Sequence, residues 1–260
     1  MKHVFSIHSP ITFLIAYSTI KYLNIPKKEV LIISSNYKVL IEGYQIIESF
    51  TESKNKDLLQ KIKYFNVPKS FDKYLDMYLK GQKFIAYIDL MSYFQKILIS
   101  HKNCNEFHFI EEGNSTYQLN DNLTDMVWPE RNLSWRTPKI NFKTLIRVLR
   151  GYNLKLLSLP YVYSAYANIR GIQFFTFSNN AYYNVLPEKR VIVKPPKNDS
   201  NILKLAGGHA TNDDCIWLDG SNNKYTGLDE KYYHNAIEKA IPILKAKGIL
   251  KDKVKVNQIY

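Results

Sequence analysis

The chain has 260 residues, of which 45% are hydrophobic and 23% charged, so it can bury one large core or two small ones and is not a disordered chain. Its 36 basic residues against 23 acidic residues give a net charge of +13, which attracts polyanions such as nucleic acid, anionic lipid or a phosphorylated substrate. No run of about 18 or more apolar residues is present, and the sequence therefore predicts no transmembrane helix.

The first three elements predict an α/β domain with a parallel sheet. Residues 3–7 indicate a strand, and Ser9 and Pro10 suit the N-cap and first turn of a helix that runs to residue 23. The apolar run 29–35 is typical of a buried parallel strand. A strand, a helix and a second strand in this order favour a Rossmann-like N-terminal domain.

The middle of the chain continues this alternation. Strands are expected at 83–88 and 105–113, and helices at 57–65, 71–81 and 91–101. Residues 38–50 fit either a helix or a strand. Ligands of open parallel sheets bind at the carboxyl ends of the strands, and the strand 105–113 ends there in a pair of acids.

The C-terminal third indicates a second unit. After a loop-like stretch, residues 141–151 predict a basic amphipathic helix, 161–185 read as irregular, and 189–193 indicate a strand. The charged, proline-containing segment 194–200 is the expected boundary, which divides the chain into an acceptor-side domain, 1–195, and a donor-side domain, 196–260. In the latter, a strand at 213–220, a helix at 229–248 and a strand at 253–260 begin a second Rossmann-like unit, expected to be incomplete.

Glu111 and Glu112 are the first candidate catalytic residues. Two adjacent acids at a strand end are either solvated or functional, and a carboxylate beside a second carboxylate is a stronger base that could deprotonate a sugar hydroxyl. Gly113 would let a substrate approach the backbone. The hydroxyl and amide groups that follow would orient that substrate; they belong to Asn114, Ser115 and Thr116.

A second set of candidates lies in two other loops. His8 and Ser9 follow the first strand and precede a helix N-terminus, where an anion or a sugar oxygen could bind. The alternative is that His8 is only a structural residue of the turn. The loop that follows the strand of the second unit could line an interdomain cleft with Asp219, Gly220 and Ser221. The histidines and cysteines form no recognisable metal motif, and we expect no metal site.

Three motifs in this order resemble bacterial sialyltransferases of glycosyltransferase family 52 and the capsule polysialyltransferases. They are the opening "FSIHSPITFLIA", the acidic–acidic–glycine triplet in "EEGNSTY", and the tail "CIWLDG" followed by "KYYHNAIEKAIPILKAKG". The resemblance implies a GT-B fold and an inverting, metal-independent transfer of sialic acid from CMP-sialic acid to a sugar hydroxyl of lipooligosaccharide or capsular glycan. It implies that Glu112 or Glu111 is the general base, and it implies no cofactor.

One expected motif is missing. The resemblance implies a His–Pro motif in the donor domain that contacts the CMP phosphate, and the only similar feature here is "HSP" at 8–10, which matches the opening instead. The donor-side domain is therefore expected to be truncated. Either the enzyme has little activity, or a partner chain supplies the rest of the site.

Two further function classes stay open: a GT-B transferase with another nucleotide-sugar donor, and a non-catalytic basic protein that binds polyanions or a membrane surface. The absence of a nucleic-acid motif argues against nucleic acid as a partner. Cys104 and Cys215 are far apart without metal spacing, and no cleavage site follows the apolar N-terminus. Both observations favour a reduced, cytoplasmic protein that could associate peripherally with the anionic inner face of the plasma membrane.

Overall fold

A computed structural model of the chain describes residues 1–35, 39, 41–48, 67–89, 92–113, 116–117, 130, 132–133, 141–159, 163–182, 185–196, 215–218, 230–246 and 256–259.

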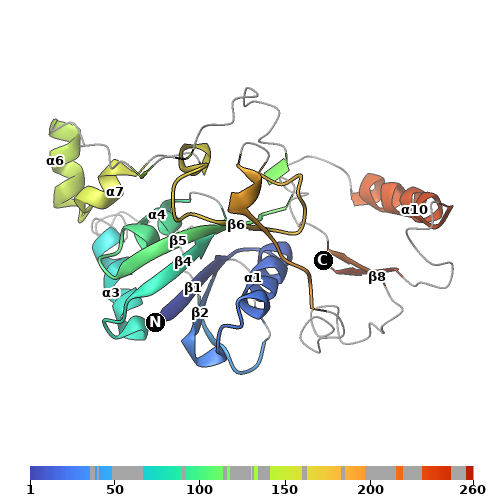
Figure 1. Cartoon of the computed structure of the whole chain (residues 1–260), viewed down its shortest axis with the longest axis horizontal. Helices are drawn as coiled ribbons and strands as arrows, with labels where there is room; N and C mark the ends of the chain where they lie inside the picture. Colours follow the sequence, from blue (N-terminus) through green and yellow to red (C-terminus); the bar gives the residue numbers. More distant parts are fainter. Residues whose placement is uncertain are drawn as a thin grey trace.

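Seven parallel strands form the main sheet in the order β3-β2-β1-β4-β5-β6-β7 (Figure 1). Their bounds are β1 (Lys2–Ile7), β2 (Val30–Ser34), β3 (Gln45–Glu48), β4 (Phe84–Ile88), β5 (Cys104–Ile110), β6 (Phe174–Thr176) and β7 (Arg190–Ile192). The chain adds strands on one side of β1 and then, from β4 onward, on the other. This is the doubly wound, Rossmann-like arrangement, and the order reverses between β1 and β4.

Both faces of this sheet are buried, because alternate residues of each strand pack on opposite sides. In β1, Val4 belongs to one apolar cluster and Phe5 to the other. The helix α1 (Pro10–Tyr22) covers the Phe5 face, while α3 (Val67–Leu79), α4 (Tyr93–Ser100) and the short α7 (Leu154–Ser158) cover the Val4 face. Burial on both faces explains why the strands read as continuous apolar runs.

Two helices begin with reciprocal caps at the carboxyl edge of the sheet. In α1, Ser9 and Thr12 form a capping box, and Pro10 occupies the first turn, where its missing N–H costs nothing. In α4, Ser92 and Gln95 form a second capping box. These caps hold the first turn of each helix against the strand ends on which the candidate residues lie.

Most of the predicted elements are present, with different bounds. The segment 38–50, left open above, contains the strand β3, and the expected helix 71–81 begins earlier, at Val67. The prediction that residues 161–185 are irregular was wrong in part, because this segment contains the strand β6, which lies between β5 and β7 in the sheet. The expected helix at 57–65 lies outside the described residues. The 3-10 turns are η1 (Lys27–Glu29), η3 (Tyr163–Tyr166) and η4 (Pro187–Lys189).

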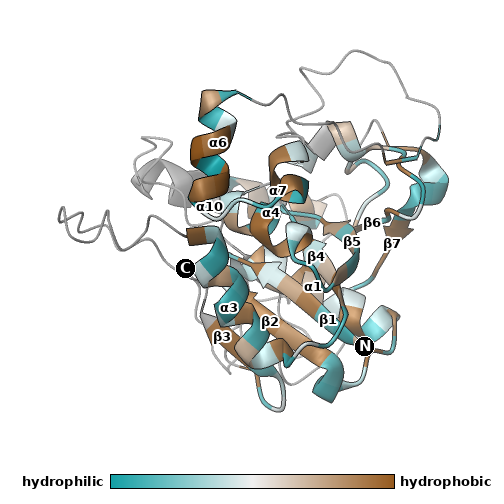
Figure 2. Ribbon diagram, turned by 90° about the vertical axis from the view of Figure 1, so that its left-hand side faces the viewer, coloured by the Kyte–Doolittle hydropathy of each residue, from teal (hydrophilic) through white to brown (hydrophobic). Residues whose placement is uncertain are grey.

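The C-terminal unit contains a parallel pair of strands, β8 (Cys215–Leu218) and β9 (Val256–Ile259), with the helix α10 (Glu230–Ala246) between them in sequence. This matches the predicted strand–helix–strand order; the domain boundary itself stays a prediction. Figure 2 shows hydropathy along the ribbon, including the apolar strands of the main sheet and the helix α6 (Phe142–Leu149). None of the described helices is long and apolar enough to cross a bilayer.

Candidate active site

His8 lies directly after β1, at the point where the strand order reverses. Only His8 and Ser9 connect β1 to α1, so the imidazole is held at the carboxyl edge of the sheet. The backbone N–H groups of His8 and Ser9 both donate to Thr12 Oγ1, at 3.0 Å each. The short turn therefore has little freedom, and His8 projects from a rigid support.

Asp89, which the sequence analysis did not select, is the partner of His8. It follows β4 directly, and its side chain is only 1% exposed. His8 Nδ1 lies 2.6 Å from Asp89 Oδ2, while Gln95 Nε2 of α4 donates to Asp89 Oδ1. One signal could have found it: Asp89 is an acid placed directly after a predicted buried strand, at the same sheet edge as His8 and the glutamate pair.

Glu112 faces the other nitrogen of His8. Its Oε1 lies 3.3 Å from His8 Nε2, and its backbone N–H donates to Thr116 Oγ1 at 3.0 Å. The second carboxylate oxygen, Oε2, is buried and has no hydrogen-bond partner among the residues that the structure describes. A buried carboxylate oxygen without a partner is costly, because it has lost its hydrogen bonds to water.

Glu111 points elsewhere and has structural partners. It is 3% exposed, accepts a hydrogen bond from the Tyr117 hydroxyl at 2.8 Å through Oε1, and accepts the Phe177 N–H at 2.8 Å through Oε2. Both carboxylate oxygens are thus occupied in joining β5 to the segment after β6. The structure separates the two acids: Glu112 faces His8, and Glu111 stabilises the sheet edge.

Gly113 has the backbone conformation that the candidate loop requires. Its φ is +103°, a backbone conformation that residues other than glycine rarely adopt. A Cβ at this position would lie 3.4 Å from Ile11 Cγ2. Its carbonyl accepts the N–H of Thr116 at 3.0 Å. The turn therefore brings the Thr116 hydroxyl back to Glu112. Asn114 and Ser115 lie outside the described residues.

The electrostatic environment makes His8 a cation. Burial by itself would lower the pKa of His8, but the contacts with Asp89 and Glu112 outweigh it and raise the pKa from 6.5 to about 10. At neutral pH an imidazolium therefore lies between two carboxylates. It can stabilise negative charge on a bound group, but it is not itself a base.

Two of the predicted sites remain, Ser9 and the loop 219–221. Ser9 caps α1 and supports the turn. Asp219, Gly220 and Ser221 lie outside the described residues, so the predicted donor-side cleft is untested. Within the described part of the chain, no group of three or more acids, histidines and cysteines could hold a metal ion.

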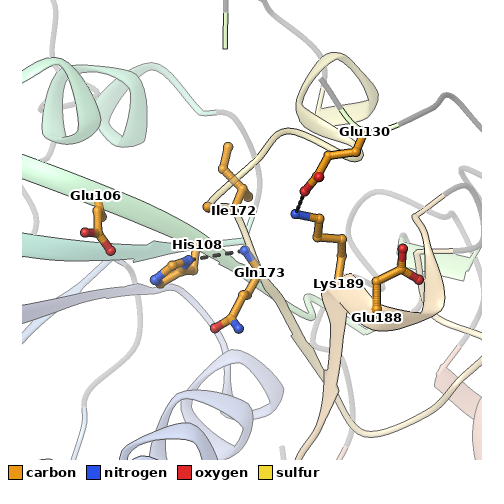
Figure 3. A pocket seen from close by; sticks show the side chains of 8 residues that line it. Glu106, His108, Glu130, Ile172, Gln173, Glu188 and Lys189 are labelled. Atoms are coloured by element: carbon orange, nitrogen blue, oxygen red, sulfur yellow. Dashed lines mark hydrogen bonds and ion pairs between the residues drawn. The ribbon is translucent and has the colours of Figure 1, made fainter. Parts of the chain in front are cut away.

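A hollow of about 450 Å³ lies at the opposite edge of the sheet, beside the starts of β6 and β7 (Figure 3). Its polar groups largely pair with one another: Lys189 forms an ion pair with Glu130, and the Gln173 N–H donates to His108 Nδ1 at 3.2 Å. Burial lowers the pKa of His108 to about 4, so this histidine is neutral. None of the residues selected from the sequence lines it.

No protein-family model, no curated protein and no solved structure matches the chain. The resemblance to sialyltransferases rests on the quoted motifs alone and stays a prediction.

Proposed function

We propose that the chain is a glycosyltransferase of the sialyltransferase type, with Glu112 as the general base. The observation that carries the proposal is the Glu112 carboxylate itself: one oxygen is buried without a described partner, and the other faces an imidazolium held by Asp89. This group lies at the carboxyl edge of a parallel sheet, beside the reversal of strand order where ligands of such sheets bind.

The proposed reaction is a single displacement. Glu112 accepts the proton of an acceptor sugar hydroxyl, whose oxygen attacks the anomeric carbon of CMP-sialic acid from the face opposite the leaving group. The bond from that carbon to the phosphate oxygen breaks, and CMP leaves with the electron pair. The configuration is therefore inverted, and the proton passes from Glu112 to solvent, which regenerates the carboxylate for the next turnover. No cofactor takes part in these steps.

The His8 imidazolium has a distinct role in this proposal. It lies beside the N-terminus of α1, and both the cation and the helix end favour negative charge in the transition state or on the departing phosphate. Asp89 is a positioning residue, because it contacts His8 and would act on the reaction only through that imidazolium. Gln95 in turn fixes the Asp89 carboxylate.

The remaining parts of the proposal follow from the resemblance. A GT-B arrangement would place the donor between the main sheet and the C-terminal strand–helix–strand unit, with Asp219, Gly220 and Ser221 toward the nucleotide. We propose a cytoplasmic site of action, with lipooligosaccharide or capsular glycan as acceptor at the inner face of the plasma membrane.

The test is turnover of CMP-sialic acid by the full chain, followed as CMP release with and without a panel of oligosaccharide acceptors. Glu112→Gln should lower the rate by about 10²- to 10⁴-fold, the usual contribution of a general base. Glu106→Gln is the matched control, since Glu106 is an exposed acid of the same strand. A full rate in Glu112→Gln would exclude Glu112 as the base.

Donor identity needs a separate measurement. Thermal unfolding of the full chain with CMP, UMP, GMP or AMP should show stabilisation by CMP, because a ligand that binds only the folded state raises its stability. Stabilisation by a different nucleotide, with turnover of the corresponding sugar donor, would retain the glycosyltransferase and replace the sialic acid donor.

A further inference from the structure

The helix α6 has an apolar face that the protein does not cover. Six of the eleven large hydrophobic residues that are exposed in the described part of the chain lie between residues 142 and 154. Phe142 is 76% exposed, Leu149 is 65% exposed, and Leu154 of α7 is 68% exposed. No side chain of α6 is buried. An exposed apolar patch of this kind usually marks an interaction surface.

The spacing of these residues forms a continuous stripe. Phe142, Leu145, Ile146 and Leu149 follow the i, i+3, i+4, i+7 pattern, which places them on one side of the helix. Lys143, Arg147 and Arg150 follow the same pattern on the neighbouring side, and all three are exposed. The helix therefore has an apolar side flanked by a basic side.

The local sequence defines α6 without help from the core. The Asn141 side chain accepts the Thr144 N–H at 2.9 Å and caps the helix. The following α7 is anchored instead: Asn153 donates to Ser100 O at 3.3 Å, and Leu156 and Leu159 are buried in the core. The attached α7 thus supports α6, which lies away from the main sheet (Figures 1 and 2).

The charge of this segment indicates what covers the face. Residues 141–159 contain four basic residues, Lys143, Arg147, Arg150 and Lys155, and no acidic residue. A second copy of the same face would bring like charges together. An anionic lipid surface offers apolar depth for the stripe and negative head groups for the flanking cations.

We propose that residues 141–159 form a membrane-docking element, with the apolar stripe of α6 inserted at the interface of an anionic bilayer. The helix has 8 residues, a length of about 12 Å, and would lie in the plane of the interface rather than cross it. This inference is independent of the proposed chemistry, because it uses none of the site residues. It names the element through which the proposed peripheral association with the membrane would occur.

The test is flotation of the full chain with vesicles of phosphatidylcholine alone or with about 30% phosphatidylglycerol, at low and high salt. We expect binding to the anionic vesicles only, weakened by salt. Phe142→Ala/Leu149→Ala and Lys143→Glu/Arg147→Glu should each reduce the partition coefficient by about tenfold or more. Because these side chains are exposed, circular dichroism and thermal unfolding should be unchanged.

Two control variants on α3 distinguish docking through α6 from the general attraction of a basic protein to anionic vesicles. Met77→Ala removes an apolar side chain that is 64% exposed, and Lys69→Glu/Lys73→Glu reverses two exposed charges four residues apart, as in the α6 pair. Both controls should bind almost as well as the parent chain. Three results would overturn the proposal: no vesicle binding, equal loss in the α3 and α6 variants, or a dimer in solution that the α6 variants dissociate.

Discussion

His8 Nδ1 lies 2.6 Å from Oδ2 of the buried Asp89, across the two strands between which the sheet reverses its order. The contact links the carboxyl ends of β1 and β4. Together with Glu112, Asp89 raises the pKa of His8 against the effect of burial, and the contact orients Nε2 toward Glu112.

Asp89→Asn should lower the pKa of His8 from about 10 toward 6.5. Burial lowers this pKa, and in the variant only the Glu112 carboxylate remains to raise it. The chemical shift of the His8 Cε1–H, assigned with a His8→Gln variant, reports the titration. Asp76→Asn is the control, since Asp76 lies 3.5 Å from His101 rather than from His8. An unchanged His8 titration in Asp89→Asn would contradict the role given to the contact.

His8→Gln should change how stability depends on pH. Because folding raises the pKa of His8 from 6.5 to about 10, the contribution of His8 is fully present below 6.5 and is lost as the pH rises through 10. The difference in unfolding free energy between the parent and His8→Gln should therefore shrink across this window. Urea unfolding at several pH values measures it, and a difference that grows with pH would show that the sign is wrong.

For His108 we expect the unfolding free energy to depend on pH in the opposite direction, and at acidic pH. Burial lowers its pKa from 6.5 to about 4, so protonation of His108 in the unfolded chain should destabilise the fold as the pH falls through this range. His108→Gln removes this part of the acid sensitivity, at a cost of about 1 kcal/mol for the altered hydrogen bond to the Gln173 N–H. Parallel acid titrations of the parent and variant, followed by circular dichroism, test it.

The two glutamate variants should affect different properties, since Glu111→Gln should lower stability and Glu112→Gln should lower turnover. Glu111 accepts two hydrogen bonds while buried, so Glu111→Gln should lower the unfolding free energy by about 1–3 kcal/mol. Glu112→Gln should change stability by less than about 1 kcal/mol and affect turnover instead. Tyr117→Phe is a second probe of the Glu111 contact, with an expected cost of about 1 kcal/mol. Equal stability losses in both glutamate variants would remove the distinction.

Gly113→Ala should destabilise the loop by about 1–3 kcal/mol, through backbone strain at φ +103°. Gly171→Ala provides the comparison, since its φ is +81° and a Cβ there meets nothing within 4 Å. Because +103° lies further from the left-handed helical region than +81°, the cost measured by thermal unfolding should be at least as large at Gly113. A smaller cost at Gly113 than at Gly171 would contradict this account.

Several parts of the site could not be read from local sequence. Asp89 has no acidic neighbour or glycine to distinguish it. Its place directly after a predicted strand makes it a candidate, but only the tertiary structure shows its contact with His8. The strand β6 was not predicted, because its two phenylalanines and one threonine lie in a longer aromatic stretch without alternation. Its place in the sheet depends on pairing with β5, which is distant in sequence, as well as with β7.

The sequence is sufficient to predict the parallel α/β architecture, because strands buried on both faces require continuous apolar runs separated by capped helices. It also places His8 and the glutamate pair at strand ends, which share one edge in any parallel sheet. The difference between the two acids, in contrast, depends on the three-dimensional fold. Glu111 and Glu112 are adjacent in the chain, and side chains that point to opposite sides of a strand end meet different neighbours: Tyr117 and Phe177 for Glu111, and His8 for Glu112.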